Sequence, residues 1–165
     1  MAYRIKHLRT DILKLSQEAF CERIGRNTNS FGGLSRFENG KRRPSLSLLF
    51  GIIKNLKVQP NWLLLGTGNI FFSSKEVDFN QFKNISRRIE IIRLNIRRSD
   101  KDFAEILGLS TGLYHYVRIH GFLSNKSKQF IFLEKIVEIF GVSPNWLILG
   151  RGEMFYKSTE YKSID

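Results

Sequence analysis

The residues with the clearest capacity for chemistry lie between positions 34 and 45, where a dense run of basic side chains follows the end of a predicted helix. Lys41, Arg42 and Arg43 are consecutive, and lysine and arginine form charge-assisted hydrogen bonds to phosphate oxygens. The stretch therefore predicts a loop that holds a polyanion through its phosphates. The alternative is an ordinary solvated surface loop.

The residues on either side of this run predict a helix, a stop and a new helix. Leu34 and Phe37 are three residues apart and share one helical face, while Arg36 points away from it. The Asn-Gly pair at 39–40 supplies the left-handed backbone that stops a helix. The Pro-Ser pair at 44–45 starts the next helix, with proline in the first turn, where it is tolerated.

Composition favours a polyanionic partner. The chain of 165 residues has 27 basic and 15 acidic side chains, a net charge of +12, which suits nucleic acid or an anionic membrane surface. It contains no apolar run of about 18 residues and does not open with a signal peptide, so we expect a cytosolic protein. The single cysteine, Cys21, excludes an internal disulfide and fits a small buried hydrophobe.

Parts of the sequence repeat at an interval of 84 residues. Residues 60–63, Pro-Asn-Trp-Leu, recur as residues 144–147 (144 − 60 = 84), and Arg-Ile at 4–5 returns at 88–89. Agreement at both ends of so long a period predicts two copies of one unit. The first 79 residues carry 13 basic and 6 acidic side chains and the rest carry 14 and 9, so neither copy is acidic.

Apolar residues of the first copy recur at helical spacing in four bursts, and nothing alternates with a period of two for long enough to predict a sheet. Ser16 is a candidate N-cap for the second helix, which Gly25 ends. A fifth short helix begins near Pro60 and closes at Gly66. These patterns predict an all-α protein.

The second copy repeats the plan. Ser99 and Ser110 are expected N-caps, and Gly108 and Gly141 are expected stops. The predicted organisation is a first domain over 1–72, a linker over 73–81, a second domain over 82–156 and a loose tail over 157–165. The helices predicted for the second copy span 82–97, 100–107, 110–119, 127–140 and 143–149.

Two segments, residues 15–25 (Leu-Ser-Gln-Glu-Ala-Phe-Cys-Glu-Arg-Ile-Gly) and residues 34–45 (Leu-Ser-Arg-Phe-Glu-Asn-Gly-Lys-Arg-Arg-Pro-Ser), closely resemble the phage-repressor-like helix-turn-helix family of the Cro/repressor or XRE type. The resemblance covers nearly all of residues 3–72 and is weaker over 86–156, where it is strong only at the two ends. It implies two tandem five-helix lambda-repressor-like domains. In this family helices two and three form the DNA-reading motif, with helix three in the major groove.

The resemblance implies DNA contacts in the first copy. Gln17, at the start of helix two, would contact phosphate, and Arg36 would reach a base edge, because arginine can bond guanine O6 and N7 together. Asn39, Lys41 and Arg43 fall where the family holds phosphate. The full set of expected DNA-binding residues is Gln17, Asn27, Thr28, Asn29, Ser30, Ser35, Arg36, Asn39, Lys41, Arg42 and Arg43.

One departure from the family affects this set. Ser35 comes ten positions after Gly25, so the turn before helix three is longer than is usual in the family. Residues 27–30 either begin helix three or lie in an extended turn, and the sequence leaves both open. Arg9 and Glu38 match the family's structural ion pair between helices one and three, so we expect them to stabilise the fold.

The second copy keeps the helix-two pattern but lacks the basic loop of the first. When Val117 is aligned with Phe37, Arg118 takes the place of a glutamate and faces Arg93. The sequence thus predicts a like-charge pair and a different arrangement of helix three. Both DNA and protein contacts remain open here, since tyrosine and arginine are enriched in protein interfaces. The candidate contact residues are Thr111, Tyr114, His115, Tyr116, Arg118, Lys126 and Lys128.

These features favour a sequence-specific regulator that binds double-stranded DNA, most simply a bacterial or phage-type repressor that acts as a homodimer or as an intrachain pseudo-dimer. The alternative is a protein-interaction or antitoxin-like adaptor in which the second copy docks a protein partner or dimerises. Enzymatic activity is the weakest hypothesis, because no catalytic set surrounds the histidines and no Gly-rich phosphate loop is visible. We expect no cofactor and no metal.

Overall fold

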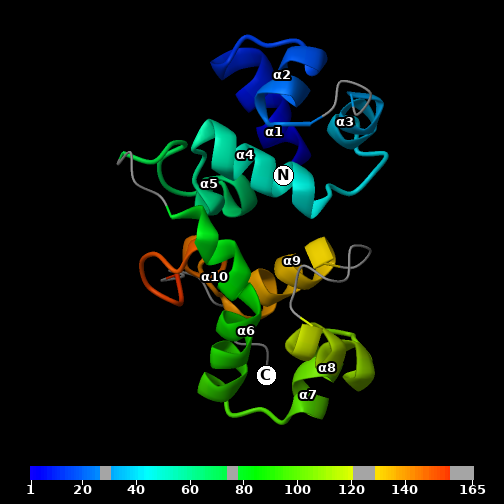
Figure 1. The fold of residues 1–165 in the computed structure, drawn as a ribbon, viewed down its shortest axis with the longest axis vertical. Helices are drawn as coiled ribbons and strands as arrows, with labels where there is room; N and C mark the ends of the chain where they lie inside the picture. Colours follow the sequence, from blue (N-terminus) through cyan, green and yellow to red (C-terminus); the bar gives the residue numbers. More distant parts are fainter. Residues whose placement is uncertain (27–30, 74–77, 121–128, 157–165) are drawn as a thin grey trace. The chain divides into compact units, whose positions relative to one another are not determined.

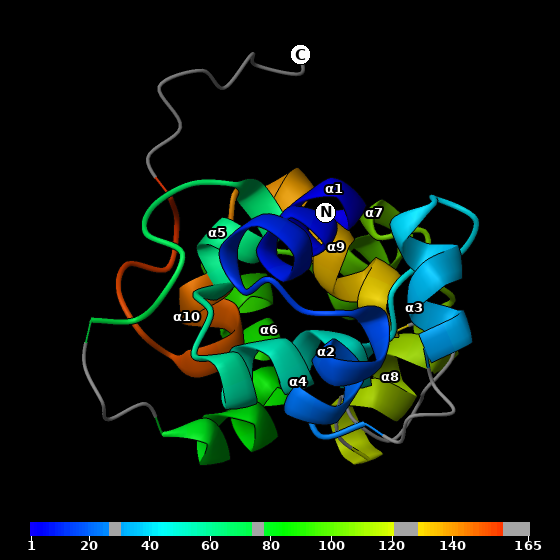
Figure 2. The same ribbon diagram turned by 90° about the horizontal axis from the view of Figure 1, so that it is seen from above.

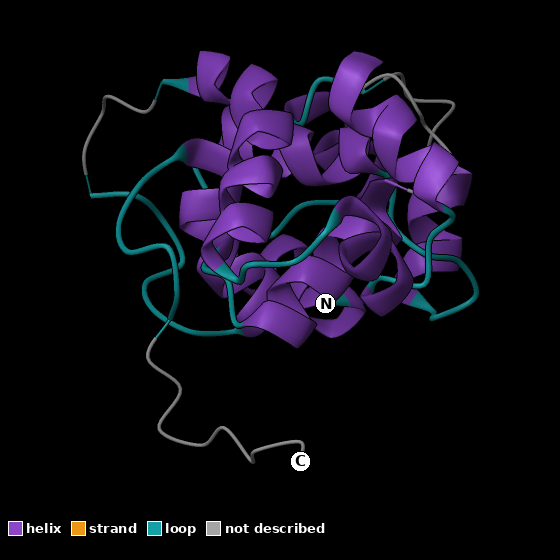
Figure 3. Cartoon of the chain, turned by 90° about the horizontal axis from the view of Figure 1, so that it is seen from below, coloured by secondary structure: helices purple, strands orange, loops and turns teal. Residues whose placement is uncertain are grey.

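Helices and their connecting loops make up the structure, a computed structural model (Figures 1 and 3). Across the described residues no β-strand is present, only isolated antiparallel bridges, so the predicted all-α class is confirmed. The structure describes residues 1–26, 31–73, 78–120 and 129–156.

The chain divides into two compact units, Met1–Val77 and Asp78–Asp165, which we call unit 1 and unit 2. The division falls inside the predicted linker at 73–81. The predicted tail at 157–165 lies outside the described residues.

Unit 1 follows the predicted order of helices. Its first helix turns into a π-helical segment, and its second and fourth helices are capped by Ser16 and Ser45, whose side chains accept hydrogen bonds from the Ala19 and Leu48 amides at 3.1 and 3.3 Å. The elements are α1 Ala2–His7, η1 Leu8–Ile12, α2 Gln17–Arg23, α3 Phe31–Glu38, α4 Leu46–Leu56 and α5 Pro60–Leu65.

The apolar faces of these helices meet in one core. Its fully buried side chains include Ile5, Leu8, Phe20, Cys21, Leu34, Leu49, Ile52 and Leu63. At Gly51 α4 passes α2 so closely that an added Cβ would lie 2.7 Å from the Ile24 carbonyl oxygen, and the two helices lie side by side in Figure 2. This core fixes the position of α3, which packs on both α1 and α2.

Unit 2 differs from its predicted helices mainly at the start. The expected helix at 82–97 is a 3-10 helix followed by an α-helix that ends two residues early, because Arg97 has a left-handed backbone (φ +53°). The Asp78 side chain caps the 3-10 helix by accepting from the Asn80 amide. The elements are η3 Phe79–Asn84, α6 Ile85–Asn95, α7 Asp100–Ile106, α8 Thr111–His120, α9 Gln129–Phe140 and α10 Pro144–Leu149.

Several contacts inside unit 1 recur inside unit 2 at the interval of 84. The Arg4 Nε donates to the Leu63 carbonyl at 3.0 Å, and the Arg88 Nε donates to the Leu147 carbonyl at 2.7 Å. Each arginine therefore stabilises the carbonyl end of the last helix of its own unit. The isolated bridge between Val58 and Phe71 likewise recurs at positions 142 and 155. That the units arose by duplication stays a prediction.

The π-helical segment η1 explains why the interval changes from 84 to 83 after the first helix. Arg9 and Arg93 are 84 residues apart, but Lys14 and Arg97, which both have left-handed backbones, are 83 apart. In η1 the Leu13 amide donates to the Leu8 carbonyl at 2.9 Å, five residues back, and such a bulge holds one extra residue within a helix. Unit 1 thus absorbs its extra residue and keeps Arg9 in place.

Candidate nucleic-acid interface

Helix α3 presents Arg36 to solvent on one face and packs into the core with the opposite face. Leu34 is fully buried and Phe37 is 4% exposed, so both belong to the core of unit 1. Arg36 lies between them in sequence and is exposed, as its place on the helix predicts. Ser35 is partly exposed beside it. The structure therefore presents these two side chains from a helix whose inner face is anchored.

The described part of α3 begins at Phe31, so Gly32 and Gly33 lie in its first turn. A Cβ at Gly32 would meet nothing within 4 Å, and one at Gly33 would lie 3.6 Å from the Arg42 guanidinium. The packing of unit 1 does not require glycine at either position, although each costs about 1 kcal/mol against alanine in a helix. The candidate contacts Asn27, Thr28, Asn29 and Ser30 fall outside the described residues.

The predicted ion pair between helices one and three is confirmed. The Arg9 Nε and Nη2 donate to the two carboxylate oxygens of Glu38 at 2.7 and 2.8 Å, and Nη1 donates to the Leu15 carbonyl at 2.9 Å. The Glu38 side chain is 2% exposed and that of Arg9 10%. Hydrogen bonding to Glu38 raises the pKa of Arg9 above its ordinary value, so the arginine keeps its charge.

Gln17 joins the same network. Its Nε2 donates to the Glu38 Oε2 at 2.7 Å, which ties the first residue of α2 to the last residue of α3. An amide group has two N–H donors, so Gln17 retains one for another acceptor. The predicted phosphate contact is compatible with this arrangement, and the contact to Glu38 sets the direction of the side chain.

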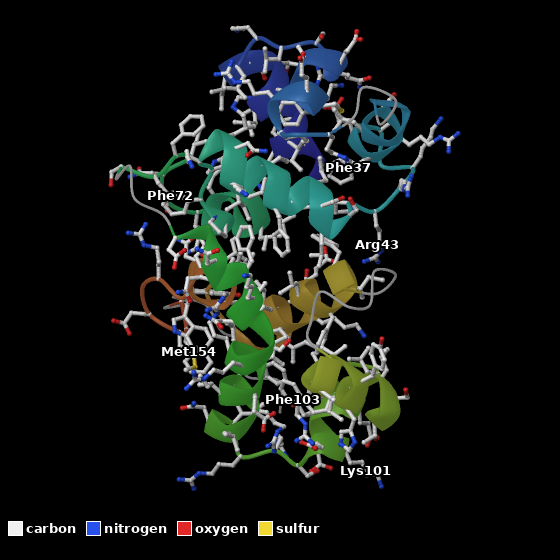
Figure 4. All side chains as sticks on the ribbon, in the orientation of Figure 1. Phe37, Arg43, Phe72, Lys101, Phe103 and Met154 are labelled. Atoms are coloured by element: carbon white, nitrogen blue, oxygen red, sulfur yellow. The ribbon has the colours of Figure 1, made fainter. Side chains whose placement is uncertain are left out.

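The loop after α3 carries the basic run. Gly40 has φ +71°, and the amide of the next residue, Lys41, donates to the Arg36 carbonyl at 2.8 Å, which closes the helix as predicted. Asn39, Lys41 and Arg42 are exposed, and so is Arg43, which Figure 4 shows extending from this loop. The structure thus brings the predicted phosphate contacts together at the end of α3.

Arg26 is a basic residue of this surface that the sequence analysis did not select. Together with Arg42, Arg43 and Ser45 it lines a pocket of about 30 Å³, large enough for about one water molecule or oxygen atom. The sequence feature that could have selected Arg26 is its position directly after Gly25, which ends α2.

Tyr114 of unit 2 is a core residue, so its prediction as a contact to DNA or a partner is wrong. It is 1% exposed, its hydroxyl donates to the Glu90 Oε2 at 2.8 Å, and its ring meets Phe103 edge-on at 5.4 Å. Burial, reinforced by the hydrogen bond to Glu90, raises the pKa of the phenol above its ordinary value. With Val117, which is 5% exposed, it forms the buried face of α8. Figure 4 labels Phe103 inside unit 2.

The predicted like-charge pair of unit 2 is also corrected. Asp100, the first residue of α7, lies between the two arginines, with Oδ1 3.1 Å from the Arg93 Nε and Oδ2 3.1 Å from the Arg118 Nη1. His115 adds a contact of 2.9 Å from its Nε2 to Oδ2. In unit 2 the carboxylates that face Arg93 thus come from α6, whose Glu90 accepts from the Arg93 Nη2 at 2.5 Å, and from α7, so α8 can carry an arginine where α3 carries a glutamate.

The other unit 2 candidates lie on or near the surface. Tyr116 is 44% exposed, the side chains of His115 and Arg118 are 43% and 40% exposed, and Thr111 is partly exposed. Lys126 and Lys128 lie outside the described residues. α8 therefore offers a mixed aromatic and basic surface with Tyr114 removed from it.

The described ranges hold neither a metal site nor a membrane-spanning helix. No group of three or more His, Cys, Asp or Glu side chains there can hold a metal ion, and no helix there is long and apolar enough to cross a membrane. Cys21 is buried and reduced, as predicted, and burial raises the pKa of its thiol.

A family model described as helix-turn-helix matches residues 5–63, a segment that contains Arg9, the α2–α3 pair and the basic loop. Searches of curated proteins and of solved structures found no match for the chain.

Proposed function

Because residues 5–63 belong to the Cro/repressor (XRE-type) helix-turn-helix family of DNA-binding regulators, we propose that this protein is a sequence-specific transcriptional repressor that reads the major groove with α3. The observation that carries the proposal is the presentation of Arg36. It is exposed on a helix whose opposite face, Leu34 and Phe37, is buried in the core. Arginine held in this way can donate two hydrogen bonds to one guanine.

The surroundings of Arg36 supply the phosphate contacts that this docking needs. The exposed Asn39 and the loop at 41–43 lie at one end of α3, and the remaining N–H of Gln17 lies at the start of α2. Phosphate contacts position the protein and base contacts give specificity. Each phosphate contact that is lost lowers the salt slope of binding by about 0.9 and weakens binding to every sequence.

Unit 2 enters the proposal as a second, divergent copy. The recurring arginine contacts at 4 and 88 and the recurring bridges support this reading. A linked second unit raises the effective concentration of the whole chain on DNA even when its own affinity is low. Since the outer residues of α3 and α8 differ, we expect an operator with two unlike half-sites, bound by one chain or by a homodimer.

The test uses the full chain and an operator selected from random duplex DNA, with affinity measured by fluorescence anisotropy. Arg36→Ala should lose about 5- to 150-fold in affinity for the operator, the size of one bidentate arginine–guanine contact, and much less for random DNA. Lys54→Ala removes the same charge from an exposed position of α4 and serves as the matched control. Equal losses on operator and random DNA would show that Arg36 does not read a base.

Chemical substitution of the DNA gives an independent check. Replacing the contacted guanine by 7-deazaguanine removes the N7 acceptor and leaves base pairing intact. The wild-type chain should lose affinity for this DNA, while the affinity of Arg36→Ala should not change.

A reporter gene placed under the control of the operator measures the sign of regulation. Transcription that rises when the protein is expressed would contradict the repressor assignment.

A further inference from the structure

The outer residues of α8 differ in kind from those of α3. The buried pair Leu34 and Phe37 corresponds to Tyr114 and Val117, which are equally buried and also three residues apart. This correspondence is a shift of 80 residues, and it places Tyr116 at the position of Arg36 and Ile119 at the position of Asn39. Unit 2 therefore presents an aromatic ring and an aliphatic side chain where unit 1 presents an arginine and an amide.

Both residues are open to solvent. Ile119 is 70% exposed and Tyr116 44%, and they lie three residues apart on one side of the helix. A Cβ at Gly112, one turn before Tyr116, would meet nothing within 4 Å, so a partner can approach the helix backbone there. Ile119 has no hydrogen-bonding group for a guanine edge, and apolar side chains contact the C5 methyl group of thymine in the major groove.

The charges around α8 suit DNA. Asp100, the first residue of α7, contacts His115 and Arg118 of α8, so the turn before α7 lies beside α8. This turn and the residue after Asp100 carry three exposed basic side chains, Arg97, Arg98 and Lys101. The Asp100 carboxylate, which would repel phosphate, faces Arg93 and Arg118.

We propose that unit 2 binds a thymine-containing half-site, with Tyr116 and Ile119 of α8 against thymine methyl groups and the basic residues at 97, 98 and 101 on the flanking phosphates. This inference rests on the proposed function and names the sequence class that the second unit reads. The basic cluster of unit 1 follows α3, whereas that of unit 2 precedes α7. The two units thus hold the backbone through different loops.

The experiment replaces thymine by deoxyuridine, which removes only the C5 methyl group, in one half-site of the selected operator at a time. The half-site of unit 1 is identified by its response to 7-deazaguanine, which Arg36→Ala abolishes. In the other half-site each contacted methyl should contribute about fourfold in affinity, the effect of burying one methyl group. In Ile119→Ala the substitution at its thymine should have no further effect.

The controls separate this proposal from the proposed function and from a protein interface. Leu94→Ala removes an aliphatic side chain that is 58% exposed on α6 and should leave the deoxyuridine response unchanged. Since Ile119 is largely exposed, its variant should fold normally, as circular dichroism will report. If 7-deazaguanine has no effect on the wild-type chain, the reader in unit 1 is refuted; the half-site of unit 2 is then identified as the one whose deoxyuridine response Ile119→Ala abolishes.

Two results would overturn the proposal. One is that deoxyuridine in the second half-site does not change the affinity of the wild-type chain. The other is that it lowers the affinity of Ile119→Ala as much as that of the wild-type chain. If, in addition to either result, Tyr116→Ala and Ile119→Ala each lower the mass of the protein in solution measured by sedimentation, α8 is a surface for a second copy of the chain.

Discussion

The replacement of Glu38 by glutamine tests the network that fixes α3 on unit 1. Glu38 accepts from the Arg9 Nε and Nη2 and from the Gln17 Nε2, all within 2.8 Å. A glutamine supplies one oxygen in place of two and turns an N–H toward the remaining donors. The Arg9 charge, on a side chain only 10% exposed, then lacks its carboxylate.

The expected loss is about 3 kcal/mol of the free energy of unfolding of unit 1. Breaking a buried ion pair by removing one partner costs about 3–5 kcal/mol, and the lower figure applies because Arg9 keeps its hydrogen bond to the Leu15 carbonyl. A unit of this size is stabilised by about 4–12 kcal/mol, so the change is large. The midpoint of thermal unfolding should fall by about 12–24 °C.

The two tryptophans allow each unit to be followed separately. Trp62 lies in unit 1 and is 8% exposed, and Trp146 is the tryptophan of unit 2. In a Trp146→Phe background, urea unfolding monitored by fluorescence therefore reports on unit 1. Glu18→Gln makes the same charge change at an exposed position of α2 and should shift stability by less than about 0.5 kcal/mol.

A loss below about 1 kcal/mol for Glu38→Gln would refute the reasoning, because the pair would then behave like an exposed salt bridge. An equal loss of stability in unit 2, measured through Trp146 in a Trp62→Phe background, would contradict the expectation that Glu38→Gln destabilises unit 1 alone.

Three further predictions concern local features. Tyr114→Phe should destabilise unit 2 by about 1–3 kcal/mol, since it leaves the ring in place and removes only the hydrogen bond to Glu90; urea unfolding followed at Trp146 measures this, and no change would place the hydroxyl in solvent. Gly32→Ala should stabilise unit 1 by about 0.4–1 kcal/mol, because its Cβ meets open space; destabilisation in the same assay on Trp62 would show that the backbone there requires glycine. The hydrogen bond from Arg93 lowers the pKa of Glu90 below its ordinary 4.5, so the contribution of Glu90 to the stability of unit 2 is complete above pH 4.5 and is lost as the pH falls through the lower folded pKa. Between pH 5 and pH 3 the free energy of unfolding of unit 2 should therefore fall less steeply in Glu90→Gln than in wild type. Identical slopes would refute this.

The sequence by itself determined the order of the main helices and the limits of those that end at a local cap or stop. Ser16, Gly25 and the Asn-Gly pair at 39–40 act on the backbone within one turn, so local chemistry is enough to place them. The spacing of Leu34 and Phe37 determined which side of α3 is buried, and hence that Arg36 is exposed. The same spacing of Tyr114 and Val117 indicates a core tyrosine, although tyrosine as a residue type is also enriched in protein interfaces.

Tertiary structure decided how the charges of α3 and α8 are balanced. Asp100 reaches Arg118 across the α7–α8 pair, and Gln17 reaches Glu38 across α2 and α3, contacts between residues that are 18 and 21 positions apart in the chain. Arg26 likewise lines one pocket with Arg42 only because two loops converge there. Such pairings depend on how the helices pack, and a local pattern of residue types does not contain that packing.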